Sequence, residues 1–320
     1  MNRFAFAAMG LLAWCLLEPA QGQERYPARP IKIIVPLGPG TVNDVVARLV
    51  GESLPKDLKT EITVEYKPGA GGVVGSDFVA KAKPDGYTLG SLNSSALTTS
   101  AVIGTVPYDP LKDFTMVANA GVNSAVLAVN GASAWKSLEE FLRHAKQNPG
   151  KASCGTSGVG TVGHFSLELL KIAAGVRINH VPYKGSPQNI TALLGGHIDC
   201  ASQIWPAVAS HVQAGRLRVL AVTSRIREAP EIPTYAQKGF SQMRLEVSFG
   251  FYGPARLPEQ VMARLVPAFE RAIKEPENVA KLEKSGFAVA YEGPKELSDR
   301  IERELGIARE VARKARIKQE

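Results

Sequence analysis

The feature that most constrains the fold of this chain is a regular alternation of strand-like and helix-like segments. In the first third of the chain the order is strand IKIIVP, helix DVVARLVGESLPKDL, strand EITVEYK, helix GVVGSDFVAKA and strand YTLGSLN. The alternation restarts after Asn130 with helix SLEEFLRHAKQ and strand KASCG, and it ends with strand LRVLAVTS. A βαβαβ order favours a mostly parallel sheet with helices on both faces. The sequence therefore predicts an α/β fold with two such units.

Two apolar, extended segments are predicted to carry the chain between the units. They are NAGVNSAVLAVN and RLEVSFGFYGP, and neither is a Gly/Ser linker. The last ~70 residues are mainly helical around one strand, FAVAYEG, and are predicted to return to the first unit. We therefore expect lobe 1 to comprise residues 23–124 plus 247–320, lobe 2 to comprise residues 125–246, and a ligand cleft to lie between the lobes.

The first 22 residues are typical of a cleaved secretory signal peptide. Arg3 supplies the positive charge, FAFAAMGLLAWCLL is the apolar segment, and Ala20-Gln21-Gly22 forms a small-x-small cleavage site. No stretch reaches the ~18 consecutive apolar residues that predict a membrane-spanning helix. We therefore expect export to the periplasm and no transmembrane segment.

Charge and metal-binding residues limit the classes of partner. The formal net charge is +8, but the sequence has no basic cluster interleaved with aromatic residues. This pattern favours small anions over nucleic acid as partners. Cys154 and Cys200 are predicted to be buried free thiols, although an oxidising compartment leaves a disulfide open. The five histidines show no metal-ligand spacing. No metal, no cofactor and no nucleic-acid partner are expected.

The loop PLGPGTVND, residues 36–44, is the first candidate site. Its glycines let backbone N–H groups approach a ligand without interference from a Cβ atom. Thr41 is positioned as the N-cap of the following helix. Asp44, three residues later, can bond back to Thr41 as a variant of the capping box. The free N–H groups and the positive end of the helix dipole favour an anion. Taken alone, the loop also fits an ordinary strand–helix turn.

A second loop of the same type follows the strand KASCG in the other α/β unit. It reads GTSGVGT, residues 155–161, and leads into the helix GHFSLELLKIAA. Ligands of open α/β sheets bind beyond the carboxyl ends of the strands, where both loops are expected. Two helix entrances, one from each lobe, are therefore predicted to converge on one anionic ligand.

Several residues near these loops have both a functional and a structural interpretation. His164 either contacts a ligand or only bonds loop backbone. Tyr183 and Lys184 follow a predicted strand, where they line the cleft or remain solvated. Asp199 either accepts from a ligand amine or braces the second loop.

An enzyme is the remote alternative. Ser157, His164 and Asp199 can be written as the triad of a secreted serine hydrolase. However, GTSGV has Val159 where the nucleophile-elbow motif requires glycine. Ser157 and His164 also share one loop-to-helix segment, which is an unusual origin for a triad recognised by its geometry. A non-enzymatic protein without catalytic residues is therefore predicted.

Long motifs through nearly the whole chain resemble those of one family, the solute-binding proteins of tripartite tricarboxylate transporters, also known as the Bug receptors. The motifs include YPARPIKIIVPLGPGTVND, KPGAGGVVGSDFVAKAKPDGYTL, VPYDPLKDF, NPGKASCGTSGVGTVGHF, INHVPYKGSPQNITALLGGHID and AGRLRVLAVTS. The resemblance implies a two-lobed periplasmic-binding-protein fold of the Venus-flytrap kind, in which two strand–helix loops hold a ligand carboxylate.

Carried over to this sequence, the resemblance implies two sets of ligand-binding residues. The first loop would contribute Leu37, Gly38, Pro39, Gly40, Thr41 and Asp44. The second loop would contribute Thr156, Ser157, Gly158, Gly160, Thr161 and His164. Segments facing the variable end of the ligand, residues 91–95 and 199–203, add Ser94, Ser95, Asp199 and Ser202, and Tyr183 completes the set.

The sequence departs from the family pattern at positions that bear on the ligand. Thr41 replaces a glycine, and Leu37 stands where phenylalanine is frequent. Ser202 and Gln203 replace an aromatic and an acidic residue, which weakens the case for amino-acid ligands because an ammonium group needs an acceptor.

The resemblance implies a monomeric receptor that captures a small organic carboxylate, either a di- or tricarboxylate or an aromatic acid. The receptor would deliver the ligand to integral-membrane permease subunits. The alternative is that it informs a sensor kinase of a two-component system.

Overall fold

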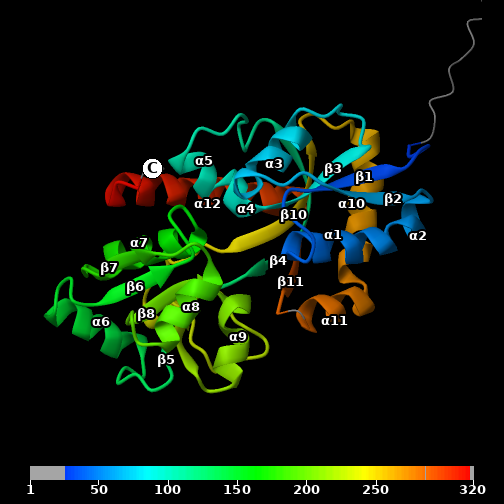
Figure 1. Cartoon of the computed structure of the whole chain (residues 1–320). Helices are drawn as coiled ribbons and strands as arrows, with labels where there is room; N and C mark the ends of the chain where they lie inside the picture. The colour runs from blue at the N-terminus through cyan, green and yellow to red at the C-terminus, as the bar shows by residue number, and fades with distance from the viewer. Residues whose placement is uncertain (1–25, 285, 318–320) are drawn as a thin grey trace, which may run out of the picture.

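The computed structural model describes residues 26–284 and 286–317, which form two lobes side by side (Figure 1). The predicted signal peptide, residues 1–22, lies outside the described residues. Within the described part of the chain, no helix is long and apolar enough to cross a membrane.

Lobe 1 is built on a six-stranded sheet with the strand order β11-β4-β10-β3-β1-β2. The strands are β1 (Ile31–Val35), β2 (Ile62–Tyr66), β3 (Thr88–Asn93), β4 (Phe114–Asn123), β10 (Val247–Pro254) and β11 (Ala288–Glu292). The side chains of Ile31, Ile33, Ile34 and Val35 are all fully buried. An apolar run of this kind is expected for a strand covered on both faces.

Lobe 2 is built on a five-stranded sheet with the strand order β7-β6-β8-β5-β9. The strands are β5 (Ala125–Asn130), β6 (Ser153–Thr156), β7 (Asn179–Pro182), β8 (Cys200–Ile204) and β9 (Leu217–Val222).

Helices flank both sheets (Figure 1). Those of lobe 1 are α1 (Val42–Ser53), α2 (Pro55–Leu58), the 3₁₀ helix η1 (Ala70–Gly72), α3 (Val73–Ala80), α4 (Ser94–Leu97), α5 (Thr99–Ile103), α10 (Glu259–Lys274), α11 (Pro276–Lys284) and α12 (Pro294–Ala315). Those of lobe 2 are α6 (Leu138–Gln147), α7 (Val162–Ala174), α8 (Ser186–Leu194), α9 (Trp205–Gln213) and the 3₁₀ helix η2 (Ala236–Lys238).

The α/β class and the two-lobed arrangement are confirmed, and both sheets are mixed, with parallel and antiparallel pairs. In lobe 1, β1 pairs in parallel with β2 and β3, whereas β10 is antiparallel to both β3 and β4. In lobe 2, β6 is parallel to β7 and β8, whereas β5 is antiparallel to β8 and β9. The antiparallel pairs arise because β5 and β10, the strands by which the chain enters lobe 2 and returns to lobe 1, run opposite to their neighbours, as β11 does beside β4.

The chain passes between the two sheets at adjacent points. Only Ser124 separates β4 from β5, and the return runs through residues 223–246. The Ser124 hydroxyl donates to the carbonyl of Ser224 at 3.0 Å, and the amide of Ala125 donates to the hydroxyl of Thr223 at 3.0 Å. These bonds join the two crossings into one hinge. We propose residues 23–124 plus 247–320 and residues 125–246 as the two lobes.

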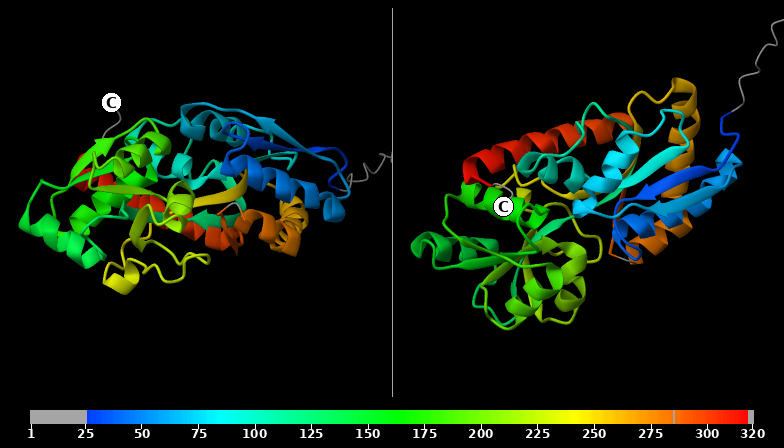
Figure 2. Two further views of the ribbon diagram at one scale, coloured as in Figure 1. Left: turned by 60° about the horizontal axis from the view of Figure 1, so that its bottom comes forward. Right: turned by 45° about the horizontal axis from the view of Figure 1, so that its top comes forward.

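Contacts outside the hinge also join the lobes. The helix α12 packs against β4 and α5 of lobe 1 and against α7 of lobe 2. Both turned views show this C-terminal helix, in red, reaching from one lobe to the other (Figure 2). Arg227 of lobe 2 donates to both carboxylate oxygens of Glu283 on α11, at 2.6 and 2.7 Å.

A buried ionic cluster ties α12 to the hinge. The guanidinium of Arg300 donates to Glu246 at 3.1 Å, to Glu292 at 2.5 and 2.8 Å, and to Glu304 at 3.3 Å. Glu246 also accepts from the hinge residue Thr223 at 3.2 Å. Burial raises the pKa of Glu304 to about 7, although the positive charge of Arg300 acts to lower it. One guanidinium therefore holds three carboxyl groups beneath the hinge.

Replacing Arg300 by methionine should lower the free energy of unfolding by about 3 kcal/mol or more, because the buried carboxylates lose their counter-charge. The control is Lys295→Met on the same helix. Lys295 pairs with Asp299 at the surface, where the side chains are 81% and 55% exposed, so its loss should cost at most about 1 kcal/mol. Urea unfolding of the three proteins measures both effects. Equal losses in the two variants would contradict a stabilising role for the cluster.

Candidate functional site

The loops that open α1 and α7 share the sequence G-x-G-T-V. Residues 38–42 read GPGTV and residues 158–162 read GVGTV. In both loops the second glycine has a left-handed backbone, with φ of 79° at Gly40 and 80° at Gly160. The threonines that follow have nearly equal angles, −75° and 163° at Thr41 and −72° and 159° at Thr161. The sequence analysis recognised two loops of one type but missed this repeat, which is visible in the residues.

Equivalent hydrogen bonds hold the two loops. The hydroxyl of Thr41 donates to the carbonyl of Gly38 at 2.8 Å, and the hydroxyl of Thr161 donates to the carbonyl of Gly158, also at 2.8 Å. Each threonine therefore closes its own loop across three residues. The two lobes present the same backbone structure to the space between them.

A side chain four residues further along braces the second glycine in each loop. In lobe 1, the amide of Gly40 donates to Oδ2 of Asp44 at 2.8 Å. In lobe 2, the amide of Gly160 donates to Nδ1 of His164 at 3.2 Å. The two braces occupy equivalent positions but differ in charge, because one is a carboxylate and the other an imidazole.

The expected capping box at Thr41 and Asp44 does not form. Thr41 is the N-cap residue of α1 by position, but its side chain caps no N–H group, and Asp44 bonds Gly40 instead of Thr41. In lobe 2, by contrast, the Thr161 hydroxyl accepts from the amide of His164 at 3.3 Å. The first turn of α1 therefore keeps uncapped N–H groups, which remain available to an anion.

The carboxylate of Asp44 accepts hydrogen bonds from the loop and from neighbouring side chains. Its Oδ1 accepts from Arg48 at 2.8 Å and from Tyr66 at 2.7 Å. Burial would raise the pKa of this carboxyl, but the bonds from Gly40, Tyr66 and Arg48 outweigh it and hold the pKa below its ordinary value. Asp44 therefore stays ionised behind the loop with its charge paired.

His164 is stacked on His180, with ring centroids 4.0 Å apart and 12° between the ring planes. Nε2 of His180 lies 2.7 Å from the hydroxyl of Thr156. Burial lowers the pKa of both imidazoles to about 4, and for His164 the neighbouring His180 and Lys171 lower it further. Both rings are therefore neutral near pH 7, and His164 can accept the Gly160 amide.

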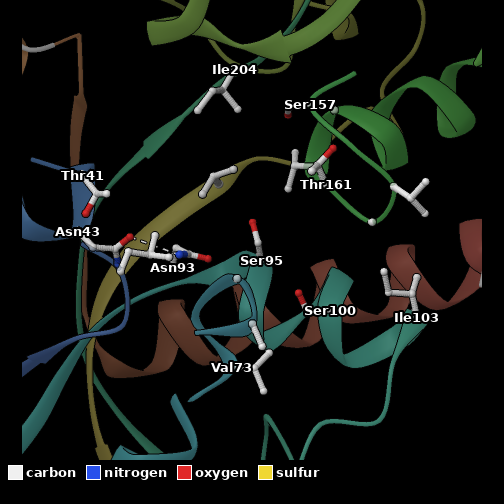
Figure 3. A pocket seen from close by; sticks show the side chains of 18 of the residues that line it. Thr41, Asn43, Val73, Asn93, Ser95, Ser100, Ile103, Ser157, Thr161 and Ile204 are labelled. Carbon is white, nitrogen blue, oxygen red and sulfur yellow. Dashed lines mark hydrogen bonds between the residues drawn. The ribbon is translucent and has the colours of Figure 1, made fainter. Parts of the chain in front are cut away.

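A cavity of about 640 Å³ lies between the two loops. In Figure 3, Ser95 and Ser100 rise toward the cavity from lobe 1, while Ser157 and Thr161 face it from the lobe 2 side. Leu37 also lines it. The described residues that line the cavity include no Asp, Glu, Lys, Arg or His. The two helix entrances are therefore its main source of positive potential.

The structure separates the predicted site residues into two groups. Those that line the cavity are Leu37, Thr41, Ser95, Ser157, Gly160 and Thr161. Those that do not line it are Gly38, Pro39, Gly40, Asp44, Ser94, Thr156, Gly158, His164, Tyr183, Asp199 and Ser202. Most of the second group shape or brace the loops from behind, as Gly38, Gly158, Asp44 and His164 do.

Asp199 and Ser202 lie away from the cavity for identifiable reasons. Asp199 precedes β8 and accepts from the amide and the hydroxyl of Ser153, both at 2.8 Å. Ile204, at the other end of β8, lines the cavity. The Ser202 hydroxyl donates to the carbonyl of Gly163 at 2.8 Å. Asp199 is therefore at the wrong end of the strand, and Ser202 is turned toward α7.

Gln203 is the residue of β8 whose polar side chain lines the cavity. Successive side chains of a strand point to opposite faces, so Gln203 faces away from the direction of Ser202. It is 1% exposed, and its Oε1 accepts from Ser186 at 2.8 Å. Its Nε2 has no hydrogen-bond partner among the described residues. A buried, unpaired amide donor is costly, which points to an acceptor supplied by a ligand.

Sequence reasoning identified Ser95 on α4 but missed the residues contributed by the next helix, α5. These two short helices follow β3 in a stretch whose periodicity predicts neither helix nor strand, and α5 places Ser100 and Ile103 at the cavity. A Cβ atom on Gly160 would lie 2.1 Å from Cδ1 of Ile103. The two lobes therefore touch at this side of the cavity, where the side chain of Ile103 packs against the backbone of Gly160.

The geometry does not form the hydrolase triad. Nδ1 of His164 accepts from Gly160, while the carboxylate of Asp199 is bonded to Ser153. Among the described residues no group of three or more His, Cys, Asp or Glu side chains is placed to hold a metal ion. Cys154 and Cys200 are buried free thiols on neighbouring strands.

Comparison with known proteins places the chain among periplasmic receptors. The profile of a family described as "Tripartite tricarboxylate transporter family receptor" matches residues 46–319. Protein BugT of Bordetella pertussis is 32% identical over 299 residues, covering 91% of this chain and 92% of BugT.

Two solved structures extend the comparison. A TctC solute-binding protein from Polaromonas superimposes with a TM-score of 0.82 at 27% identity, over 90% of this chain and 99% of that one. The R. palustris protein Rpa4515, solved with adipate, superimposes with a TM-score of 0.75 at 28% identity, over 92% and 99% of the two chains.

The stacked histidines predict a loss of stability in acid. Their pKa in the fold, about 4, is below the ordinary 6.5, so the neutral form is favoured by folding. The stabilisation is complete above pH 6.5 and is lost as the pH falls from 6.5 toward 4. His164→Asn keeps an acceptor for Gly160 but cannot titrate, so its melting temperature should fall less steeply over this window.

The exposed His197→Gln serves as the control, and it should follow the wild-type pH curve. Melting temperatures measured by calorimetry at half-unit steps of pH give the three curves. If His164→Asn and the wild type lost stability in parallel, the His164 imidazole would not be responsible for the acid sensitivity.

Proposed function

Because the chain belongs to the tripartite tricarboxylate transporter receptor family, whose members are periplasmic solute-binding proteins and not enzymes, we propose that it captures a small organic carboxylate between its lobes. The observation that carries the proposal is the pair of G-x-G-T-V helix entrances at one cavity, together with the unpaired amide of Gln203. The captured acid is delivered to the membrane permease of a tripartite transporter.

The charge of the helix entrances suits a carboxylate. Each helix N-terminus carries the equivalent of roughly half a positive charge, so α1 and α7 together balance about one negative charge. Their N–H groups, the hydroxyls of Ser95 and Ser157 and the Nε2 group of Gln203 are donors for its oxygens. The R. palustris neighbour solved with adipate supports a carboxylate as the ligand class.

The arrangement also couples capture to closure of the lobes. A ligand shifts a conformational equilibrium only through a difference in its affinity for the two states. A carboxylate that bonds α1 in lobe 1 and α7 in lobe 2 makes its full set of bonds only when the lobes are together. The hinge at Ser124 and Thr223 connects the two lobes without a rigid element between the sheets. The net charge of +8 steers anions toward the protein.

Carboxylates should raise the melting temperature of the wild-type protein, whereas neutral sugars should not. A ligand present at 100 times its Kd stabilises the folded state by ~2.7 kcal/mol, which calorimetry resolves. Gln203→Glu keeps the acceptor for Ser186 but replaces the amide donor by a negative charge. This variant should bind the best carboxylate of a mixed panel at least tenfold more weakly, which is a loss of about 1.4 kcal/mol.

Gln188→Glu is the matched control, since it adds the same formal charge at an exposed position of α8. It should bind like the wild type. Stabilisation by a neutral sugar and by no carboxylate would contradict the proposed function. Undiminished carboxylate binding by Gln203→Glu would show that the Gln203 amide does not face the anion.

A further inference from the structure

We propose that the ligand has one carboxylate and an otherwise uncharged, largely apolar body. This inference rests on the proposed function, and it specifies which acids the cavity accepts. The carboxylate lies at the α1 and α7 entrances, and the body lies against an apolar wall formed by Val73, Ile103, Val106 and Val159. A second charged group, either carboxylate or ammonium, is excluded.

The balance of charge in the cavity supports one carboxylate. The two helix entrances supply about one positive charge, and no Lys, Arg or His is among the described residues that line the cavity. Two basic groups near the first loop and the hinge are already paired. Arg48 bonds Asp44 behind the first loop, and Arg300 bonds three carboxyl groups beneath the hinge. A second carboxylate would lose its hydration and gain no counter-charge.

The cavity would also give an ammonium no carboxylate counter-charge. No Asp or Glu is among the described residues that line it. The only buried side chain of β8 turned toward the ligand, Gln203, has its Oε1 occupied by Ser186 and presents the unpaired Nε2 donor. An ammonium has only donors and gains no bond from this Nε2 group, whereas a carboxylate oxygen accepts from it.

The apolar wall gives the body of the ligand a place to bind. Val73 begins α3, and Ile103 ends α5 with Val106 three residues beyond it, so three segments of lobe 1 meet here. Val73 and Val106 both pack against the same apolar cluster of lobe 1. Figure 3 shows Val73 and Ile103 on the side of the cavity away from Thr41.

Lobe 2 completes this wall. Val159 stands beside Gly160, which is the residue in contact with Ile103. Val159 is 42% exposed, so covering it with a ligand removes apolar surface from water. A volume of about 640 Å³ is far larger than a carboxylate group and leaves room for such a body.

Four compounds with the same six-carbon chain test the inference by isothermal titration calorimetry. Hexanoate has one carboxylate, adipate has two, 6-aminohexanoate adds an ammonium, and hexanamide has no charge. We expect hexanoate to bind the wild type at least tenfold more tightly than adipate or 6-aminohexanoate. Hexanamide should bind at least tenfold more weakly than hexanoate, because it lacks the charge that the helix entrances stabilise.

A cation placed in the apolar wall should reverse the preference between the two acids. Val159→Lys puts an ammonium there at an exposed position, where the substitution need not disturb folding. Val159→Gln is the matched control, since it is long and polar but uncharged. We expect Val159→Lys to bind adipate at least as tightly as hexanoate, and Val159→Gln to keep the wild-type order.

The outcomes separate this inference from the proposed function. Binding of adipate to the wild type as tight as that of hexanoate would overturn the single-carboxylate inference and leave a carboxylate receptor in place. Equal binding of hexanamide and hexanoate would overturn the proposed function as well. Failure of all four compounds, with binding of another carboxylate from the mixed panel, would overturn this inference and leave a carboxylate receptor in place.

Discussion

The N–H groups at the start of α1 and α7 are the constraint on which the rest of the structure depends. An α-helix leaves its first N–H groups without intrahelical partners, and at α1 no side chain of the loop caps them. Both loops have a positive-φ glycine and a threonine that bonds back across three residues, so the two helix entrances share one backbone conformation. The strands β1 and β6, each in its own sheet, lead into these two loops and place both helix entrances at one cavity.

The remainder of the chain keeps the two entrances opposite each other. The crossings at Ser124 and Thr223 bond to one another, and Arg300 holds Glu246 of the hinge against α12. Because α12 packs on both lobes, movement of one lobe also changes its contacts with this helix. The charged residues of this arrangement lie beneath or outside the cavity, and they leave an uncharged interior whose selectivity comes from dipoles and shape.

The sequence predicted the helices and strands well where their periodicity was strong, and it failed where short segments depended on packing. The helix EQVMARLVPAFERAIK coincides with α10, Glu259–Lys274. The helices α4 and α5 are too short to show a period, so Ser100 and Ile103 escaped notice. On β8 the prediction chose Ser202 as a site residue, whereas Gln203 lines the cavity, because one step along a strand reverses the direction of a side chain.

The sequence by itself determined the α/β alternation, the two glycine-rich helix entrances and the family, because these reside in local periodicity, in backbone freedom at particular glycines and in long ordered motifs. Only the tertiary structure decided that the sheets are mixed, that Asp44 and His164 brace the loops from behind, and that Gln203 and Ile103 meet the entrances at one cavity. These outcomes depend on how distant segments pack, and strand register and lobe contacts leave no periodic signal along the chain.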